Sequence, residues 1–300
     1  MKKNTYLFAL MTMALTLGSC SADENGIGGE TSKYITVSTS IGNMTRVATD
    51  ANGGQTFEEG DEISVYAWTG APTVAPETSE RVVNNAINKL TNGSWISTPQ
   101  MLWKNNREKH YFIGVYPTAA ISDLSAGEYT FDVNKQTESD LLVAVNKDGI
   151  SYNADEQQTV PLTFTHVMAK LVVNLTYKNQ WGGIPTVEKV VVGNAAKEAT
   201  INYLTKVVTP STTAKEDFSL PEITENTKYV SVIIPQEDVK QLTIVIGGKN
   251  FVYDNGTPFK LESGKITTVN LEVGRDEIKL GDVKITNWED GSTFSGEALN

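Results

Sequence analysis

Short runs of alternating apolar and polar residues recur along most of the chain, and they limit its fold more than any other feature. Alternation with a period of two gives a half-buried strand, with one face toward the core and one toward solvent. Turn signals such as Asn92-Gly93 and Asn255-Gly256 separate the runs, and the pattern predicts an all-β sandwich or barrel. The runs are residues 34–41, 62–68, 111–116, 129–133, 160–164, 170–177, 187–192, 229–234, 242–246, 265–273 and 283–288.

Residues 80–90 (ERVVNNAINKL) are less clear. The apolar residues have helical spacing, but they fit a strand equally well: Val82, Val83, Ala86, Ile87 and Leu90. Both readings stay open for this segment.

The first 19 residues have the layout of a secretory signal. Lys2 and Lys3 precede an apolar run over residues 6–17, and the small residues Gly18 and Ser19 follow it. A membrane span needs about 20 apolar residues, so this run is too short to be one. We therefore predict that residues 1–19 are a signal peptide.

Cys20 follows this signal and is the chain's only cysteine, so no disulfide can form within the chain. The order Leu17-Gly18-Ser19-Cys20 resembles the lipobox of bacterial lipoprotein precursors, which implies cleavage before Cys20 and acylation of its thiol. The alternative is an ordinary signal with a cysteine near its cleavage point. Two or three acyl chains, such as palmitate, hold a protein firmly to a membrane.

Residues 20–32 are acidic at first and then glycine-rich, which is typical of a flexible tether. Their acidic start resembles the signal that directs lipoproteins to the outer face of the outer membrane, although a solvated linker would look similar. The net charge of −11 argues against nucleic acid as a partner, because that requires basic patches. The length suits two domains, and we place them at 33–166 and 167–300.

The sequence contains few of the residues and motifs that are typical of a catalytic site. The chain has two histidines and lacks the common motifs for metal, nucleotide or nucleophilic sites, so we expect no enzyme, cofactor or metal. His110, beside charged residues, is predicted to lie in a solvated turn, and His166 to end a strand with a satisfied hydrogen bond. The acidic segment 58–62 and Asp290 are interpreted as turn residues rather than calcium ligands.

The five tryptophans fall into two groups. Trp68 and Trp288 lie on alternating runs, so we predict that they pack in the core. Trp95, Trp103 and Trp181 lie among glycine and asparagine residues, and they are candidates for stacking on a sugar ligand.

The order of several motifs resembles the fimbrillin family of Bacteroidetes-type bacteria, which includes the Mfa-like pilus subunits and adhesins. The motifs start with Met44-Thr45-Arg46-Val47 and span most of the chain after the signal. The others are FEEGDEISVY at 57–66, FIGVYP at 112–117, LTFTHVMAKL at 162–171, IPQ at 234–236, LESGKIT at 261–267 and ITNWEDG at 285–291.

This resemblance implies two tandem transthyretin-like β-sandwich domains with Greek-key connections. It also implies assembly by strand exchange, in which an outer-membrane protease cuts after Arg46, Val47 becomes the new N-terminus, and the strand at 34–41 leaves a groove. A strand from the next subunit then fills the groove. Some anchor and adhesin subunits of the family stay uncut, in which case 34–41 remains a permanent strand. Residues 277–288 could donate a strand, whereas a tip subunit needs no donor.

Two classes of function remain. The leading hypothesis is a fimbrial subunit or a tip or accessory adhesin at the cell surface, with other fimbrial subunits, the outer membrane and a host protein or glycan receptor as partners. The alternative is a surface glycan-binding lipoprotein of a polysaccharide-uptake system, which would use exposed tryptophans.

Overall fold

The computed structural model describes residues 33–42, 56–156, 158–254 and 256–288. The predicted all-β fold is confirmed, because nineteen strands accompany two short helical turns in this part of the chain. The strands are β1 (Thr36–Ile41), β2 (Glu62–Thr69), β3 (Val83–Thr91), β4 (Ser94–Thr98), β5 (Lys109–Tyr116), β6 (Gly127–Thr130), β7 (Leu142–Ser151), β8 (Thr159–His166), β9 (Ala169–Tyr177), β10 (Val187–Ala196), β11 (Glu198–Asn202), β12 (Val207–Pro210), β13 (Lys215–Ser219), β14 (Glu222–Thr224), β15 (Lys228–Ile233), β16 (Gln241–Ile246), β17 (Lys249–Asp254), β18 (Lys265–Val273) and β19 (Ile278–Asn287). The helical turns are η1 (Thr78–Glu80) and α1 (Gln136–Ser139).

Seven strands form one sheet in the order β1-β8-β7-β5-β2-β3-β4. All neighbours in it are antiparallel except β1 and β8, which run parallel. The ambiguous segment 80–90 mostly forms strand β3, so the helical reading is wrong. Its inward positions pack on the core while its backbone pairs with β2 and β4.

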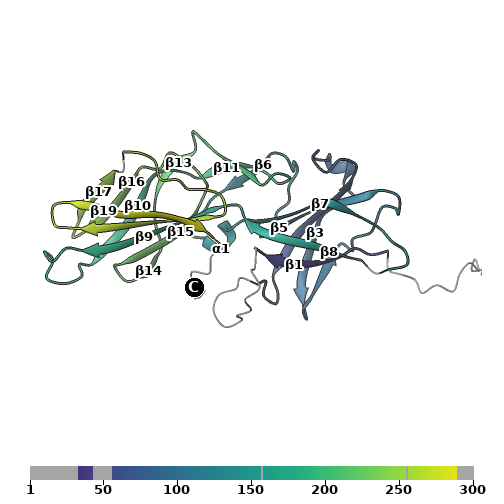
Figure 1. Ribbon diagram of the computed structural model, residues 1–300, viewed down its shortest axis with the longest axis horizontal. Helices are drawn as coiled ribbons and strands as arrows, with labels where there is room; N and C mark the ends of the chain where they lie inside the picture. Colours follow the sequence, from purple (N-terminus) through teal and green to yellow (C-terminus); the bar gives the residue numbers. More distant parts are fainter. Residues whose placement is uncertain (1–32, 43–55, 157, 255, 289–300) are drawn as a thin grey trace, which may run out of the picture.

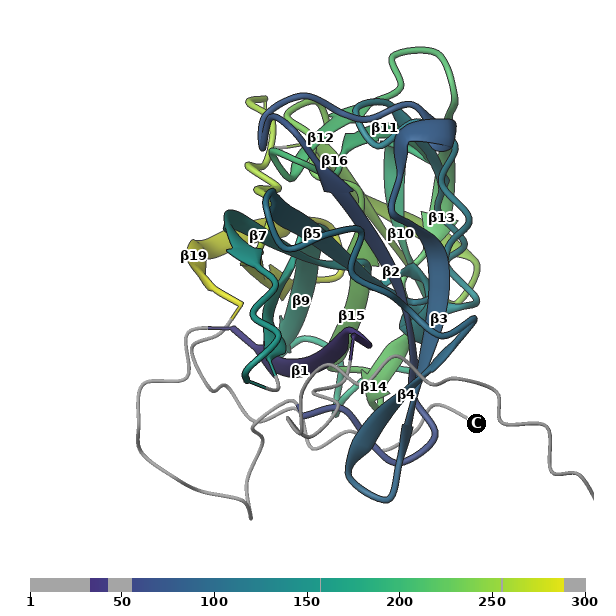
Figure 2. The same ribbon diagram turned by 90° about the vertical axis from the view of Figure 1, so that its right-hand side faces the viewer.

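The second half of the chain forms a five-stranded sheet, β14-β15-β9-β18-β19, and a four-stranded sheet, β13-β10-β16-β17. Figure 1 shows these sheets at one end of an elongated molecule and the seven-stranded sheet at the other. A three-stranded sheet, β12-β11-β6, joins the halves, because β6 comes from the first half and pairs with β11 from the second. Figure 2, which shows the molecule turned by 90°, has β1 and the β3–β4 hairpin on the same lower side.

Two clusters of buried apolar side chains hold these sheets together. The smaller contains residues from β1, β2, β3, β5, β7 and β8, and it packs on one face of the seven-stranded sheet. The larger extends from Tyr66 to Trp288 and therefore includes residues from both halves of the chain. The division at 166 and 167 coincides with the passage from β8 to β9, and two separate domains stay a prediction.

Within the described ranges, no helix is long and apolar enough to cross a membrane.

Candidate functional site

The candidate site is the groove that holds strand β1, and strand β8 forms the first wall of this groove. The two strands run parallel in register from Thr36 and Thr159 to Ile41 and Phe164. The backbone N–H of Gly42 extends this ladder by donating to the carbonyl of Phe164 at 2.7 Å. The partners are separated by more than 120 residues of sequence, so the pairing of β1 with β8 is a long-range tertiary contact.

The opposite edge is bonded just before β1, where Lys33 and Ile35 meet the segment that follows β4. The N–H of Ile35 donates to the carbonyl of Met101 at 3.0 Å, and the N–H of Trp103 donates to the carbonyl of Lys33 at 3.2 Å. Further along, Trp95 Nε1 on β4 donates to Thr39 Oγ1 at 3.0 Å. The segment 33–41 is therefore paired with β8 along one edge, and its other edge is held by the backbone bonds of Lys33 and Ile35 and by the Trp95–Thr39 bond.

The side chains of β1 alternate as the sequence predicts. Ile35 and Val37 point inward and are 1% and 6% exposed. Thr36 and Ser40 point outward, where their hydroxyls lie 3.1 and 3.2 Å from the hydroxyls of the facing β8 threonines. Fully burying an isoleucine or valine side chain is worth about 1.5–3 kcal/mol, so β1 contributes several kcal/mol to the smaller core.

Phe164 forms the floor of the groove beneath the end of β1. It is fully buried, and Phe57 packs edge-on against it with ring centroids 5.1 Å apart. Gly114 on β5 provides the space for this ring, because a Cβ there would lie 2.6 Å from Phe164 Cζ. Phe57 also meets Trp95 and Tyr116, each at 5.3 Å, so an aromatic cluster closes this end of the groove.

Three predicted processing and anchoring residues lie outside the described residues: Cys20, Arg46 and Val47. The structure does describe β1, which lies in the sequence between Cys20 and Arg46. β1 ends at Ile41, five positions before Arg46. Cleavage after Arg46 would thus cut the chain beyond the strand and leave β1 held only by noncovalent contacts.

The three tryptophans proposed for ligand stacking lie in different places. Trp95 is half-buried and donates to β1, as described above. Trp103 is 8% exposed, and its ring is covered by Tyr152 in a stacked arrangement at 5.9 Å. Trp181 is half-buried and donates to the carbonyl of Val273 at 3.0 Å. The structure does not bring the three rings together on one surface.

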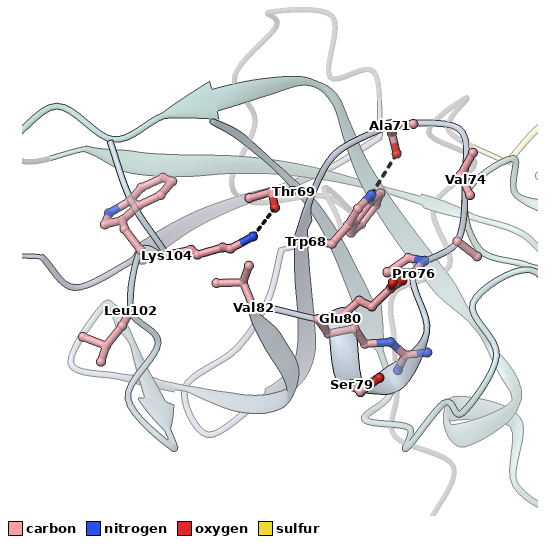
Figure 3. A pocket seen from close by; sticks show the side chains of 13 residues that line it. Trp68, Thr69, Ala71, Val74, Pro76, Ser79, Glu80, Val82, Leu102 and Lys104 are labelled. Carbon is pink, nitrogen blue, oxygen red and sulfur yellow. Dashed lines mark hydrogen bonds between the residues drawn. The ribbon is translucent and has the colours of Figure 1, made fainter. Parts of the chain in front are cut away.

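A pocket of about 750 Å³ lies next to the segment that follows β4, which forms the second wall of the groove (Figure 3). Lys104 Nζ donates to Thr69 Oγ1 at 3.0 Å, and Leu102 on the rim is 44% exposed. Leu102 also forms an isolated bridge with Tyr34 just before β1, so one wall of this pocket depends on the strand in the groove.

The prediction for His110 is wrong, because this residue has no exposed surface. It lies on β5 in the core, where its Nε2 accepts a hydrogen bond from the N–H of Lys104 at 3.0 Å. The ring of Trp103 meets it edge-on at 5.0 Å. Burial lowers the pKa of His110 below its ordinary value, which favours the neutral ring. Of the charged neighbours in sequence, Arg107 and Glu108 lie in the bend before β5, and Lys109 is the exposed first residue of the strand.

The predictions for His166, Trp68 and Trp288 are confirmed. His166 ends β8, and its Nδ1 lies 2.8 Å from Asp140 Oδ1. Trp68 is 1% and Trp288 7% exposed. Trp288 stacks on the His166 ring at a centroid distance of 4.1 Å, and Lys170 Nζ lies 4.6 Å from the Trp288 ring. Burial lowers the pKa of Lys170. This stack fastens the end of β19 to the junction of β8 and β9.

The acidic segment at 58–62 is a turn, as predicted. Glu59 accepts hydrogen bonds from the backbone N–H groups of Asn92 and Gly93, and Asp61 accepts one from Glu58. These bonds join the turn before β2 to the β3–β4 hairpin. In the part of the chain that the structure describes, no cluster of three or more histidine or acidic side chains could hold a metal ion. Asp290 lies outside that part.

Sequence reasoning missed two residues that shape this region. Thr39 carries no signal beyond its place in an alternating strand, since its partner Trp95 is distant in sequence. Arg81 lies next to β3 and is 9% exposed, and its guanidinium donates to the carbonyls of Ile121 and Ser122 at 2.6 and 2.5 Å. A charged residue beside a strand is ordinarily solvated, so nothing in the sequence marked it.

Comparison with known proteins agrees with this architecture. A fimbrial protein from Bacteroides vulgatus matches with a TM-score of 0.52 at 14% identity, over 84% of this chain and 99% of that one. A protein from Bacteroides uniformis, provisionally described as a cell adhesion protein, matches with a TM-score of 0.65 at 17% identity, over 86% and 100% of the two chains. At these identities the likeness shows the fold alone. Among curated proteins, none matches the chain.

A family model extends the comparison to sequence. The model described as fimbrillin-like matches residues 45–288, which is most of the chain and includes all the strands after β1. The earlier resemblance was based on motifs in the same region, and it is confirmed. The chain therefore belongs to the fimbrillin-like family.

Proposed function

We propose that this protein is a fimbrial subunit or a tip or accessory adhesin at the cell surface, and that it assembles by strand exchange. The observation that carries the proposal is the way in which β1 is held in its groove. This strand packs Val37 into the smaller core and pairs along its length with β8, yet it is joined to the next strand only through the segment that contains Arg46. One cut after Arg46 would convert β1 from part of the chain into a bound peptide.

Loss of β1 would leave a groove with two unsatisfied sides. The backbone groups of β8 and of residues 101–103 would lose their partners, and the apolar floor around Phe164 would face solvent. Unpaired buried backbone groups and exposed apolar surface are both unfavourable. An extended segment from another subunit removes both penalties at once, which is the physical basis of β-strand addition. No step in this assembly requires catalysis by this chain, because the cut after Arg46 is made by a separate protease.

The anchor and the donor belong to the same proposal. Acylated Cys20 would hold the uncut protein at the outer membrane, and the cut after Arg46 would release it, because Cys20 and β1 lie on the same side of that bond. Strand β19, within the predicted donor region, lies at the edge of its sheet and pairs with β18 alone among the described strands. It exposes Leu280, Val283 and Ile285, which would suit a strand that enters an apolar groove.

Cleavage at a single bond tests the proposal. We expect a chain with Cys20→Ser, cut after Arg46 by an arginine-specific protease, to form multimers that persist in SDS without heating. The multimers persist because each inserted strand is held by a full ladder of hydrogen bonds and a buried apolar face. Electrophoresis with and without heating measures them, together with mass spectrometry that confirms a new N-terminus at Val47.

The control is the same chain with Arg46→Ala, which we expect to keep β1 and stay monomeric under identical treatment. A wild-type chain that is fully cut at Arg46 yet remains monomeric at every concentration would contradict the proposed assembly.

A further inference from the structure

The groove has one polar contact inside an otherwise apolar set. Ile35, Val37, Thr39 and Ile41 share the inward face of β1, and Thr39 is the one polar residue among them. Its hydroxyl accepts a hydrogen bond from Trp95 Nε1 at 3.0 Å. The outward hydroxyls of β1 meet β8, whereas the Thr39 hydroxyl meets β4 on the other wall.

Trp95 is held in place for this contact by its own surroundings. Its ring is half-buried against the smaller core, and Phe57 packs edge-on against it at 5.3 Å. An indole N–H is a donor only, so it can be satisfied by an acceptor and by nothing else. Among the described residues, the acceptor that this N–H finds is the Thr39 hydroxyl of the strand in the groove.

We propose that Trp95 is a specificity determinant of the groove, which selects strands that carry a side-chain oxygen at the position of Thr39. This inference rests on the proposed function, because it concerns the strand that replaces β1. The occupant is an extended segment with two alternating apolar residues, at the positions of Ile35 and Val37, followed two residues later by a hydroxyl or amide oxygen. An apolar residue at that third position removes the protein acceptor of the indole N–H.

The same contact fixes the register of the occupant. A strand shifted by two residues still places apolar side chains inward, since the side-chain period is two. It no longer places its acceptor opposite Trp95, so the register that pairs the indole is favoured over its neighbours. Specificity of this kind arises from the penalty on the wrong partner as much as from the contact with the right one.

Exchange of labelled peptides into the cut protein tests the proposal. The receivers are used directly after cleavage, before multimers form. They are the full chain with Cys20→Ser, cut after Arg46 with β1 still bound, and the same chain with Trp95→Phe, which keeps an aromatic ring and loses the N–H. The probes are fluorescent peptides of residues 33–42 with threonine, serine or valine at position 39. Valine matches the shape of threonine without its hydroxyl.

We expect the valine peptide to leave the wild-type receiver about tenfold faster than the threonine peptide, because an unpaired donor costs about that much in binding. The serine peptide should stay within about twofold of threonine. In the Trp95→Phe receiver the threonine and valine peptides should dissociate at the same rate. An equal preference for threonine in both receivers would overturn the role of Trp95.

A second arm separates this inference from the proposed function. If no peptide enters either receiver, strand exchange fails, and the uncut chain then decides the question for Trp95. There Thr39→Val should speed hydrogen exchange of the β1 amides about tenfold in the wild-type background and leave it unchanged in the Trp95→Phe background. The same acceleration in both backgrounds would overturn the inference whatever the fate of the peptides.

Discussion

Val37→Asp is expected to drive β1 out of its groove in the uncut protein. Val37 is 6% exposed and lies in the smaller core, so the substitution places a carboxylate among buried apolar side chains. Burying an uncompensated charge costs about 4 kcal/mol or more, which is comparable with what the inward side chains of β1 contribute. Hydrogen exchange measured by mass spectrometry should show loss of protection at both β1 and β8.

The matched control is Ser38→Asp, one position along the same strand. Ser38 points outward and is exposed, so the same charge there stays in water. We expect protection of β1 in this variant to stay near the wild-type level. Equal loss of protection in the two variants would show that β1 is not held by its inward face.

Trp288→Ala is expected to release the end of β19. The side chain is 7% exposed and lies between His166 and Lys170, so its removal leaves a cavity and an unstacked imidazole. Truncation of a buried tryptophan typically costs about 3–5 kcal/mol. Because Trp288 follows directly after β19, the loss should appear first as faster hydrogen exchange at the end of that strand, and as a lower midpoint of urea unfolding.

Trp288→Phe provides the comparison for that experiment. A phenyl ring retains most of the stacking on His166, and it removes an indole N–H that has no partner among the described residues. We expect the phenylalanine variant to recover more than half of the lost stability. If alanine and wild type show equal protection of β19, the stack on His166 does not hold the strand.

The local pattern of the sequence predicted the fold class because many of the strands alternate between apolar and polar residues. Alternation marked β2, β5, β9 and β18 within a residue or two of their observed ends. It failed to mark β7, where LLVAV is continuous rather than alternating and sits between β5 and β8 inside the sheet. A strand that packs on both faces has no polar side to reveal its period.

The candidate site was only partly predictable, since its contacts join residues that are distant in sequence. The strand at 34–41 was visible as a pattern, but its parallel pairing with β8 is a long-range property. Trp95 looked like an open surface ring because its neighbours are turn residues, and its partner Thr39 is 56 residues away. His110 was misplaced for the same reason, since charges next to it in the chain are not next to it in space.

A disulfide across the groove provides the most direct test of the central claim that β1 must leave before subunits join. Ser40 and Thr163 face each other on β1 and β8, and their hydroxyl oxygens are 3.2 Å apart. Cysteines at both positions are therefore close enough to bond, and with Cys20→Ser they are the chain's only thiols.

The measurement is the fraction of SDS-resistant multimers after cleavage at Arg46, compared between oxidised and reduced samples of this double-cysteine chain. A chain with Ser40→Cys alone controls for effects of the reductant. We predict that the oxidised protein is cut, keeps β1 through the disulfide and stays monomeric, and that reduction of the same sample starts assembly. Multimers that form equally well with the disulfide intact would contradict strand exchange at the β1 groove.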